Sequence, residues 1–104
     1  MRIRLKVKSV KIPFSVISIE NSAFSRCSLL DSVEIPPSVL YICDNAFESC
    51  YQLKNVYIPS SVTSFGHYVF KDCENLEVVI QNSKDKISFV SNSFKGCKSV
   101  TYTN

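Results

Sequence analysis

Apolar residues recur along this chain of 104 residues with a period of about 23 residues. Phenylalanine stands at positions separated by 23, 23 and 24 residues, and a cysteine follows each phenylalanine three positions later. The two columns comprise Phe24, Phe47, Phe70, Phe94, Cys27, Cys50, Cys73 and Cys97. A fixed period of this length is typical of a solenoid, in which each repeat forms one coil. We therefore expect both columns to be structural ladders.

Further apolar positions recur with the same period. A leucine or valine follows each cysteine by three positions, and a second apolar residue follows three positions later. These columns are Leu30, Leu53, Leu76 and Val100, followed by Val33, Val56 and Val79, with Thr103 in the last place. A single coil cannot bury its own apolar side, so coils stacked about 4.8 Å apart must share one core.

Within each repeat, a short segment alternates apolar and polar residues. In SVEI, residues 32–35, the valine and isoleucine point one way and the serine and glutamate the other, which predicts a half-buried strand. The proline that follows ends the strand because it lacks a backbone donor. The segment VLYI, residues 39–42, predicts a second short strand or turn, and DNAFESC, residues 44–50, predicts a single helical or 3₁₀ turn.

The repeat unit, C-x-x-L-x-x-V-x-I-P-x-S-V-x-x-I-x-x-x-A-F-x-x, resembles the BspA-like, or Treponema pallidum-type, leucine-rich repeat. The resemblance runs from about Val7 to Thr103 and is carried most specifically by I-P-x-S-V and A-F-x-x-C. It implies a right-handed superhelix of about four 23-residue units. A parallel sheet would line the concave side, with short strands or 3₁₀ turns on the other. Members of this class are associated with surface proteins that adhere to host or matrix proteins.

The fourth repeat departs from this pattern. Gln81 and Asn82 replace the Ile-Pro pair, Ser93 replaces the alanine before phenylalanine, as Val69 does one repeat earlier, and QNSKDK carries an extra residue. We therefore expect an irregular loop there.

The chain has the length of one domain. We divide it into a basic N-terminal strand or cap, four repeats and the start of a further strand: residues 1–12, 7–29, 30–52, 53–75, 76–99 and 100–104. Both ends fall near the same phase of the repeat, so we expect a fragment of a longer array. The C-terminal end has no evident polar cap, and self-association through it is one alternative.

Positive charge is concentrated at the start of the chain. Five of the twelve basic residues lie in the first eleven positions: Arg2, Arg4, Lys6, Lys8 and Lys11. The other seven face nine acids, which leaves residues 12–104 at about −2. No basic patch continues beyond this segment, so we expect no nucleic-acid partner. We favour a charged first strand that shields the stack over a membrane-binding polybasic segment, and we expect no membrane contact.

The start of the chain also lacks the pattern of a secretory signal, because basic and apolar residues alternate there. A cell-surface or secreted location is therefore implied by the resemblance alone.

Five cysteines in so short a chain raise the question of metal or disulfide chemistry. A linear ladder cannot converge on one metal ion, so we predict no metal site and no cofactor. Disulfides between adjacent rungs are geometrically allowed. We favour buried, reduced cysteines that fill a narrow corner. Cys43 stands outside the column, where Gly66 stands one repeat later, and it is either the most exposed thiol or a partly buried filler.

Catalysis has little support in the sequence. The only histidine, His67, lies in a variable stretch, and the column cysteines should be buried and unactivated. There is no carboxylate pair or glycine-rich phosphate loop. We therefore predict that the chain is not an enzyme.

A partner would bind at exposed positions between the repeating columns. The outward strand positions give a candidate protein-binding concave face: Lys11, Glu34, Tyr57, Val78, Ile80 and Tyr102. An exposed apolar group of this kind often marks an interaction surface, but β-branched and aromatic residues also simply favour strands, and both interpretations stay open. Our leading hypothesis is a non-catalytic protein-binding module, and the resemblance implies that it is part of a surface adhesin. The alternatives are a structural or self-associating scaffold and an intracellular adaptor.

Overall fold

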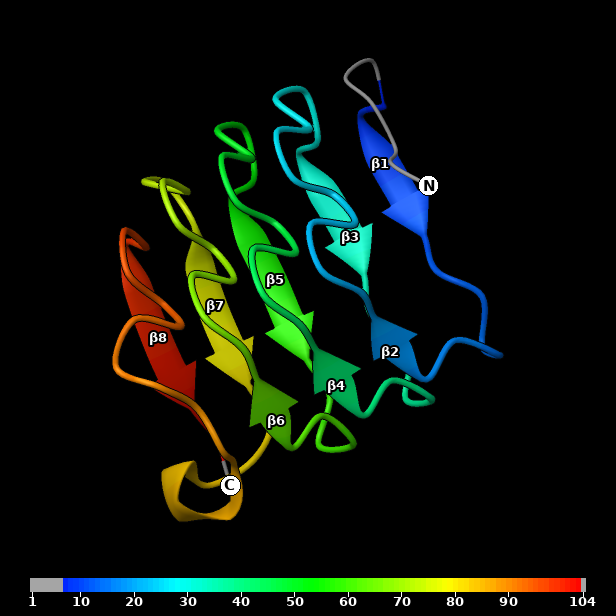
Figure 1. Ribbon diagram of the computed structural model, residues 1–104, viewed down its shortest axis with the longest axis vertical. Helices are drawn as coiled ribbons and strands as arrows, with labels where there is room; N and C mark the ends of the chain where they lie inside the picture. Colours follow the sequence, from blue (N-terminus) through cyan, green and yellow to red (C-terminus); the bar gives the residue numbers. More distant parts are fainter. Residues whose placement is uncertain (1–6, 104) are drawn as a thin grey trace.

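The computed structural model describes residues 7–103, which form two rows of short strands (Figure 1). One row contains β1 (Ser9–Lys11), β3 (Ser32–Glu34), β5 (Asn55–Ile58), β7 (Glu77–Ile80) and β8 (Ser99–Tyr102). The other contains β2 (Ser18–Ile19), β4 (Tyr41–Ile42) and β6 (Ser64–Phe65), and a 3₁₀ helix, η1 (Lys84–Lys86), follows β7. Residues 1–6, half of the basic N-terminal strand or cap that we predicted, lie outside the described residues.

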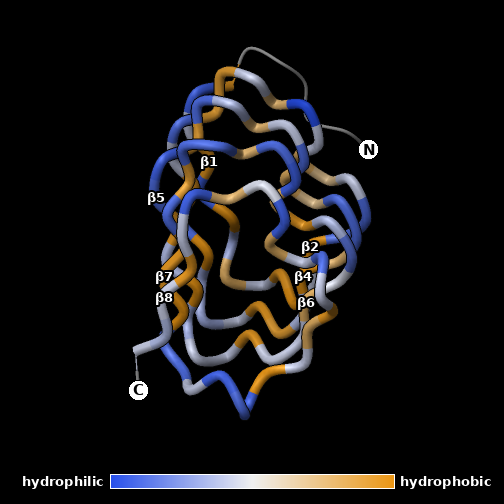
Figure 2. Tube along the Cα trace, turned by 90° about the vertical axis from the view of Figure 1, so that its left-hand side faces the viewer, coloured by the Kyte–Doolittle hydropathy of each residue, from blue (hydrophilic) through white to orange (hydrophobic). Residues whose placement is uncertain are grey.

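Every strand pairing is parallel among the residues that the structure describes. Hydrogen bonds join β1 to β3 in one sheet, β5 to β7 and β7 to β8 in a second, and β2 to β4 and β4 to β6 in a third. The strands β3 and β5 are neighbours but belong to separate hydrogen-bonded sheets. Figure 2 shows the coils stacked on one another. The predicted repeat fold, a parallel β-solenoid of leucine-rich repeats, is confirmed.

The core between the two rows contains a continuous stack of phenylalanine rings. The centroids of Phe24 and Phe47 are 5.2 Å apart with an interplanar angle of 8°, and those of Phe47 and Phe70 are 5.5 Å apart at 10°. Phe94 extends the stack at 6.2 Å from Phe70. Such stacking adds a directional contact to the burial of the rings, because aromatic pairs prefer particular relative orientations. The ring stack therefore aligns equivalent residues of successive coils.

The segment that carries each phenylalanine is a chain of turns closed over three residues, which is closer to the 3₁₀ turn than to the helical turn among the two that we predicted. In the second coil, backbone bonds link Cys43 to Ala46, Asn45 to Glu48 and Phe47 to Cys50, each spanning three residues. Helical winding stops because Asn45 and Ser49 have positive φ angles of 58° and 61°. The first and third coils repeat this pattern at Ser22, Arg26, Tyr68 and Asp72.

These left-handed residues direct backbone groups toward the next coil. The Arg26 N–H donates to the Glu48 carbonyl at 2.7 Å, and the Ser49 N–H donates to the Lys71 carbonyl at the same distance. Buried backbone donors and acceptors need partners, and here the adjacent coil provides them. The turns are therefore part of the interface between coils, as the strands are.

Ser93 explains one departure of the fourth repeat from the pattern. It occupies the alanine column and is fully buried. Its hydroxyl donates to the Gly66 carbonyl at 2.7 Å and accepts the Val90 N–H at 3.0 Å. The hydroxyl thus connects two backbone groups that the methyl group of alanine would leave without these partners.

Replacing Ser93 with alanine restores the residue of the first two repeats, but we expect it to destabilise the chain. The loss of two buried hydrogen bonds should lower the free energy of unfolding by about 1–3 kcal/mol. Urea unfolding followed by circular dichroism measures this change. Ser91→Ala, at an exposed position nearby, is the control, with an expected change within about 0.5 kcal/mol. A Ser93→Ala chain as stable as the wild type would contradict the role of the hydroxyl.

Candidate functional site

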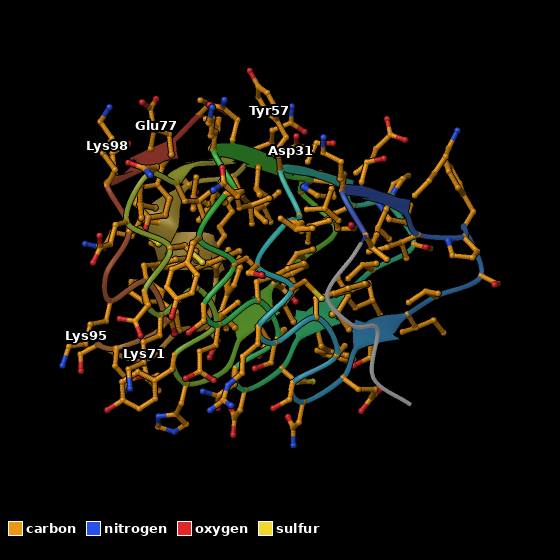
Figure 3. The ribbon with its side chains drawn as sticks, turned by 90° about the horizontal axis from the view of Figure 1, so that it is seen from above. Asp31, Tyr57, Lys71, Glu77, Lys95 and Lys98 are labelled. Carbon is orange, nitrogen blue, oxygen red and sulfur yellow. The ribbon has the colours of Figure 1, made fainter. Side chains whose placement is uncertain are left out.

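The outward side chains of the longer strand row form one surface, which we call the outer sheet face. Its members are Ser9, Lys11, Ser32, Glu34, Asn55, Tyr57, Glu77, Val79, Ser99 and Thr101. Successive residues in a strand point to opposite sides, so these side chains alternate with core residues. Figure 3 shows Tyr57 and Glu77 projecting outward from this row, with Lys98 beside Glu77.

The structure corrects half of the predicted binding face. Val78 and Ile80, which we expected to point outward, are both 0% exposed. Val78 is paired with Val56 and Val100, and Ile80 is paired with Ile58 and Tyr102. Tyr102 accordingly belongs to an inward column and is half-buried. Lys11, Glu34 and Tyr57 remain exposed on the outer sheet face.

The cause of this error is a shorter turn before β7. Three positions separate Leu53 from Val56 in the third coil, whereas only two separate Leu76 from its counterpart, Val78. A shift of one residue exchanges the two sides of a strand. Val79 is therefore the outward residue, although the leucine and cysteine columns remain in step.

The last coil also departs from the columns that the repeat period predicts. Val100 is paired with Val78 rather than lying in the leucine column, and Thr103 lies beyond the end of β8. Neither residue therefore occupies the column to which the period assigned it.

Tyr57 is the dominant apolar group of the outer sheet face. Its side chain is 62% exposed, and its partner in the sheet is the half-buried Val79. An open depression of about 500 Å³ lies beside it, lined by residues of β1, β3 and β5 that include Lys11, Glu34 and Asn55. The aromatic ring thus adjoins both polar side chains and a hollow in the surface.

Charged groups on this face are mostly unpaired with one another. Among the described residues the structure has one ion pair, in which Lys98 lies 3.3 Å from Glu77, and both side chains are well exposed. An ion pair in water contributes little to stability. Lys11 and Glu34 are aligned across β1 and β3 without forming an ion pair. Both charges are therefore accessible to another molecule.

The cysteine column contributes hydrogen bonds to the coil stack. The Cys50 thiol donates to the Phe24 carbonyl at 3.2 Å, and the Cys73 thiol donates to the Phe47 carbonyl at 3.1 Å. Cys97 has a longer contact of 3.9 Å with the corresponding carbonyl of Phe70. A thiol is small, easily buried and a weak donor, which suits a position facing a backbone oxygen.

The environment of Cys27, Cys50 and Cys97 disfavours the reactive thiolate. Contact with the Cys73 thiol, followed by burial, raises the pKa of Cys50. Burial raises the pKa of Cys97 to about 12 and also raises that of Cys27. Because the thiolate is the nucleophile, Cys27, Cys50 and Cys97 should be unreactive near neutral pH.

Other candidate chemistry is equally sparse. His67 is exposed, and its backbone N–H donates to the Asp44 carboxylate at 2.9 Å. Within residues 7–103, no group of three or more histidine, cysteine or acidic side chains is arranged to hold a metal ion. None of the helical segments in this range has the length and hydropathy needed to cross a membrane.

Comparison with known proteins agrees with this architecture. Residues 3–104 match the sequence model of a protein family, which is described as the BspA-type leucine-rich repeat region (six copies). The chain belongs to the BspA-type leucine-rich repeat family. No curated protein matches the chain.

Two solved structures of leucine-rich proteins share the fold. A leucine-rich cell surface protein from Faecalibacterium prausnitzii is 25% identical, with a TM-score of 0.79 over 96% of this chain and 27% of its own. A leucine-rich repeat protein from Bacteroides ovatus is 36% identical, with a TM-score of 0.74 over 95% of this chain and 26% of its own. The chain thus spans about a quarter of the length of each structure.

In β7 and β8 of this BspA-type array, sequence reasoning missed every residue of the outer sheet face: Glu77, Val79, Ser99 and Thr101. One signal could have identified the first two. In the second and third repeats, proline follows the last isoleucine of the strand, so aligning Ile80-Gln81 with Ile58-Pro59 reproduces the observed register. The strand ends therefore locate the outward positions better than the leucine column does.

The register of β7 makes adjacent valines respond differently to the same substitution. Val78→Ala removes buried methyl groups, and we expect it to lower the free energy of unfolding by about 1–3 kcal/mol. Val79→Ala, on the outer sheet face, should change it by less than about 0.5 kcal/mol. Urea unfolding of the two variants provides the measurement. A larger loss for Val79→Ala would reverse the assignment of the two faces.

The thiols should react in a defined order. We expect Cys43, which is partly exposed and lies outside the column, to react first with a thiol reagent at pH 8. Cys97 should react slowly, and faster as the pH approaches about 12, because its thiol is mostly protonated below that value. Mass spectrometry of the labelled chain identifies each site, and Cys43→Ser should abolish the fast phase. Rapid labelling of Cys50 or Cys73 before unfolding would contradict the buried column.

Proposed function

We propose that the chain is a non-catalytic protein-binding module that contacts its partner through the outer sheet face. The observation that carries this proposal is the 62% exposure of Tyr57 beside an open depression. Tyrosine is enriched at binding hot spots because its ring provides a large apolar contact and its hydroxyl a polar one. In our interpretation Tyr57 is the central anchor of the contact.

The surroundings of Tyr57 support this role. Val79 extends the apolar area on one side, whereas Glu34 and Lys11 lie on the other. Protein interfaces commonly combine a small aromatic or apolar centre with a polar rim. The outer sheet face has this composition, and its charged rim would select partners by electrostatic complementarity.

Membership of the BspA-type family supports a role in protein interaction, and we extend it to a location on the cell surface. The Faecalibacterium prausnitzii structure is described as a leucine-rich cell surface protein. We therefore propose adhesion to host or matrix proteins as the setting in which the outer sheet face acts.

A scaffold that joins copies of the chain is the second candidate. Phe94, Val100 and Tyr102 of the last described coil are half-buried, and a second copy of the chain would cover them as a further repeat would. Light scattering over a range of concentrations distinguishes the two functions, because a scaffold would increase in mass with concentration.

Tyr57→Ala tests the proposed anchor. The chain and its variants are passed over a panel of immobilised matrix proteins on a biosensor. For any protein that binds, we expect Tyr57→Ala to weaken affinity at least tenfold, because a hot-spot residue contributes about 2 kcal/mol or more. Tyr51→Ala, at a 53% exposed tyrosine outside the strands, is the matched control and should leave affinity unchanged. Equal binding by the wild type and Tyr57→Ala would exclude the outer sheet face as the site.

A further inference from the structure

Charge alternates in sign from one coil to the next along the longer strand row. When each strand is counted with the residue just before it, the charges of β1, β3, β5, β7 and β8 are +2, −2, +1, −1 and +1. The charged residues are all exposed: Lys8, Lys11, Asp31, Glu34, Lys54, Glu77 and Lys98. Figure 3 shows Glu77 and Lys98 on the same side of the molecule as Tyr57. The strand row therefore presents bands of alternating charge beside its exposed tyrosine.

Contacts within the chain use only part of this charge pattern. Opposite charges on neighbouring strands attract each other, which is the structural reason for alternation. Among residues 7–103, however, only Lys98 and Glu77 lie within ion-pair distance, at 3.3 Å. Lys11 and Glu34 are aligned in the sheet and do not form an ion pair. Most of the charges are therefore available to another molecule.

A face whose charge alternates between coils is complementary to a second copy of itself. Two identical faces meet about a two-fold axis, and an axis parallel to the strands reverses the order of the coils in the second copy. If that axis lies between two coils, every coil faces one of opposite sign. If it lies on a coil, like charges meet, so only axes between coils are compatible with the pattern.

The apolar residues of the outer sheet face select one of these axes. Tyr57 and Val79 are partners in the sheet on the adjacent strands β5 and β7. An axis between these two strands places Tyr57 of each copy opposite Val79 of the other, so that apolar groups meet at the centre and charged groups surround them. This is the usual composition of a specific interface, with an apolar centre and a polar rim. Charge and apolar contact thus agree on a single two-fold axis.

We propose that two copies of the chain pair through their outer sheet faces about the two-fold axis between β5 and β7. Lys54 of each copy then faces Glu77 of the other, and Asp31 faces Lys98. The inference rests on the proposed function, because it names a partner for the same face. Only β3, β5, β7 and β8 overlap, which is a small area, so we expect a weak, salt-sensitive dimer. The dimer covers Tyr57 and competes with any other partner for it.

Sedimentation equilibrium over a range of concentrations measures the dimer. We expect the mass of the wild type to rise to that of two chains and no further, because a two-fold contact is closed. Tyr57→Ala should weaken dimerisation about tenfold or more. Lys54→Glu and Glu77→Lys should each weaken it too, because like charges then meet. Lys95→Glu makes the same change of charge on the other side of the molecule in Figure 3, and this control should dimerise like the wild type.

Mixing the two charge variants gives a second test. In a mixed pair, position 54 of each chain again faces a charge of opposite sign at position 77 of the other. An equimolar mixture of Lys54→Glu and Glu77→Lys should therefore dimerise more strongly than either variant alone. Mixing would not reverse an effect of either substitution on the fold of its own chain, so recovery depends on the contact between copies.

Four results would overturn the proposal. They are a wild type that stays monomeric at every concentration, dimerisation of Tyr57→Ala like the wild type, dimerisation of both charge variants like the wild type, and a mixture no stronger than its components. A mass that keeps rising beyond two chains would also overturn it and would assign self-association to the last coil. These measurements contain no matrix protein, so failure of the dimer is distinguished from failure of the proposed function.

Discussion

The contact between successive coils is the interaction on which the rest of this structure depends. No single coil has a core of its own, because its phenylalanine, cysteine and leucine side chains are buried only against the coils on either side. The stacked rings set the step between coils, and the left-handed residues of each turn direct backbone groups across the same interface. Strand pairing, turn geometry and ring stacking therefore all require one register.

The cysteine column shows how this constraint selects residue types. The thiols of Cys50 and Cys73 face the carbonyls of Phe24 and Phe47 at fully buried positions. Cysteine combines small volume, a weak donor and tolerance of burial. We had attributed the column to volume alone, and periodicity could show no more, because the spacing of residues says nothing about which backbone atom each one faces. The position of Ser93 beside Gly66 was hidden for the same reason.

The period of the sequence predicted the fold because the columns repeat wherever the core is shared. It failed where the chain changes length between two columns. The turn after Leu76 lacks one residue relative to the turn after Leu53, and the strand that follows is displaced although the next phenylalanine returns to its column. A strand has two sides, so an error of one residue exchanged Val78 for Val79. Tyr57 was predicted correctly to be exposed because no length change precedes it. Local insertions thus affect a predicted surface more than a predicted core.

The same reasoning separates structure from function at the surface. In a repeat protein, each coil serves as a control for its neighbours, since the fold needs the same things at equivalent positions of every coil. Tyr57 stands where earlier coils have Lys11 and Glu34, and the same strand forms in all three coils. The stack therefore does not demand a tyrosine at this position. Ser93 is the opposite case, because its difference from alanine satisfies two backbone groups of the stack. Position 57 is accordingly one at which selection for binding can act without loss of stability, whereas position 93 is not.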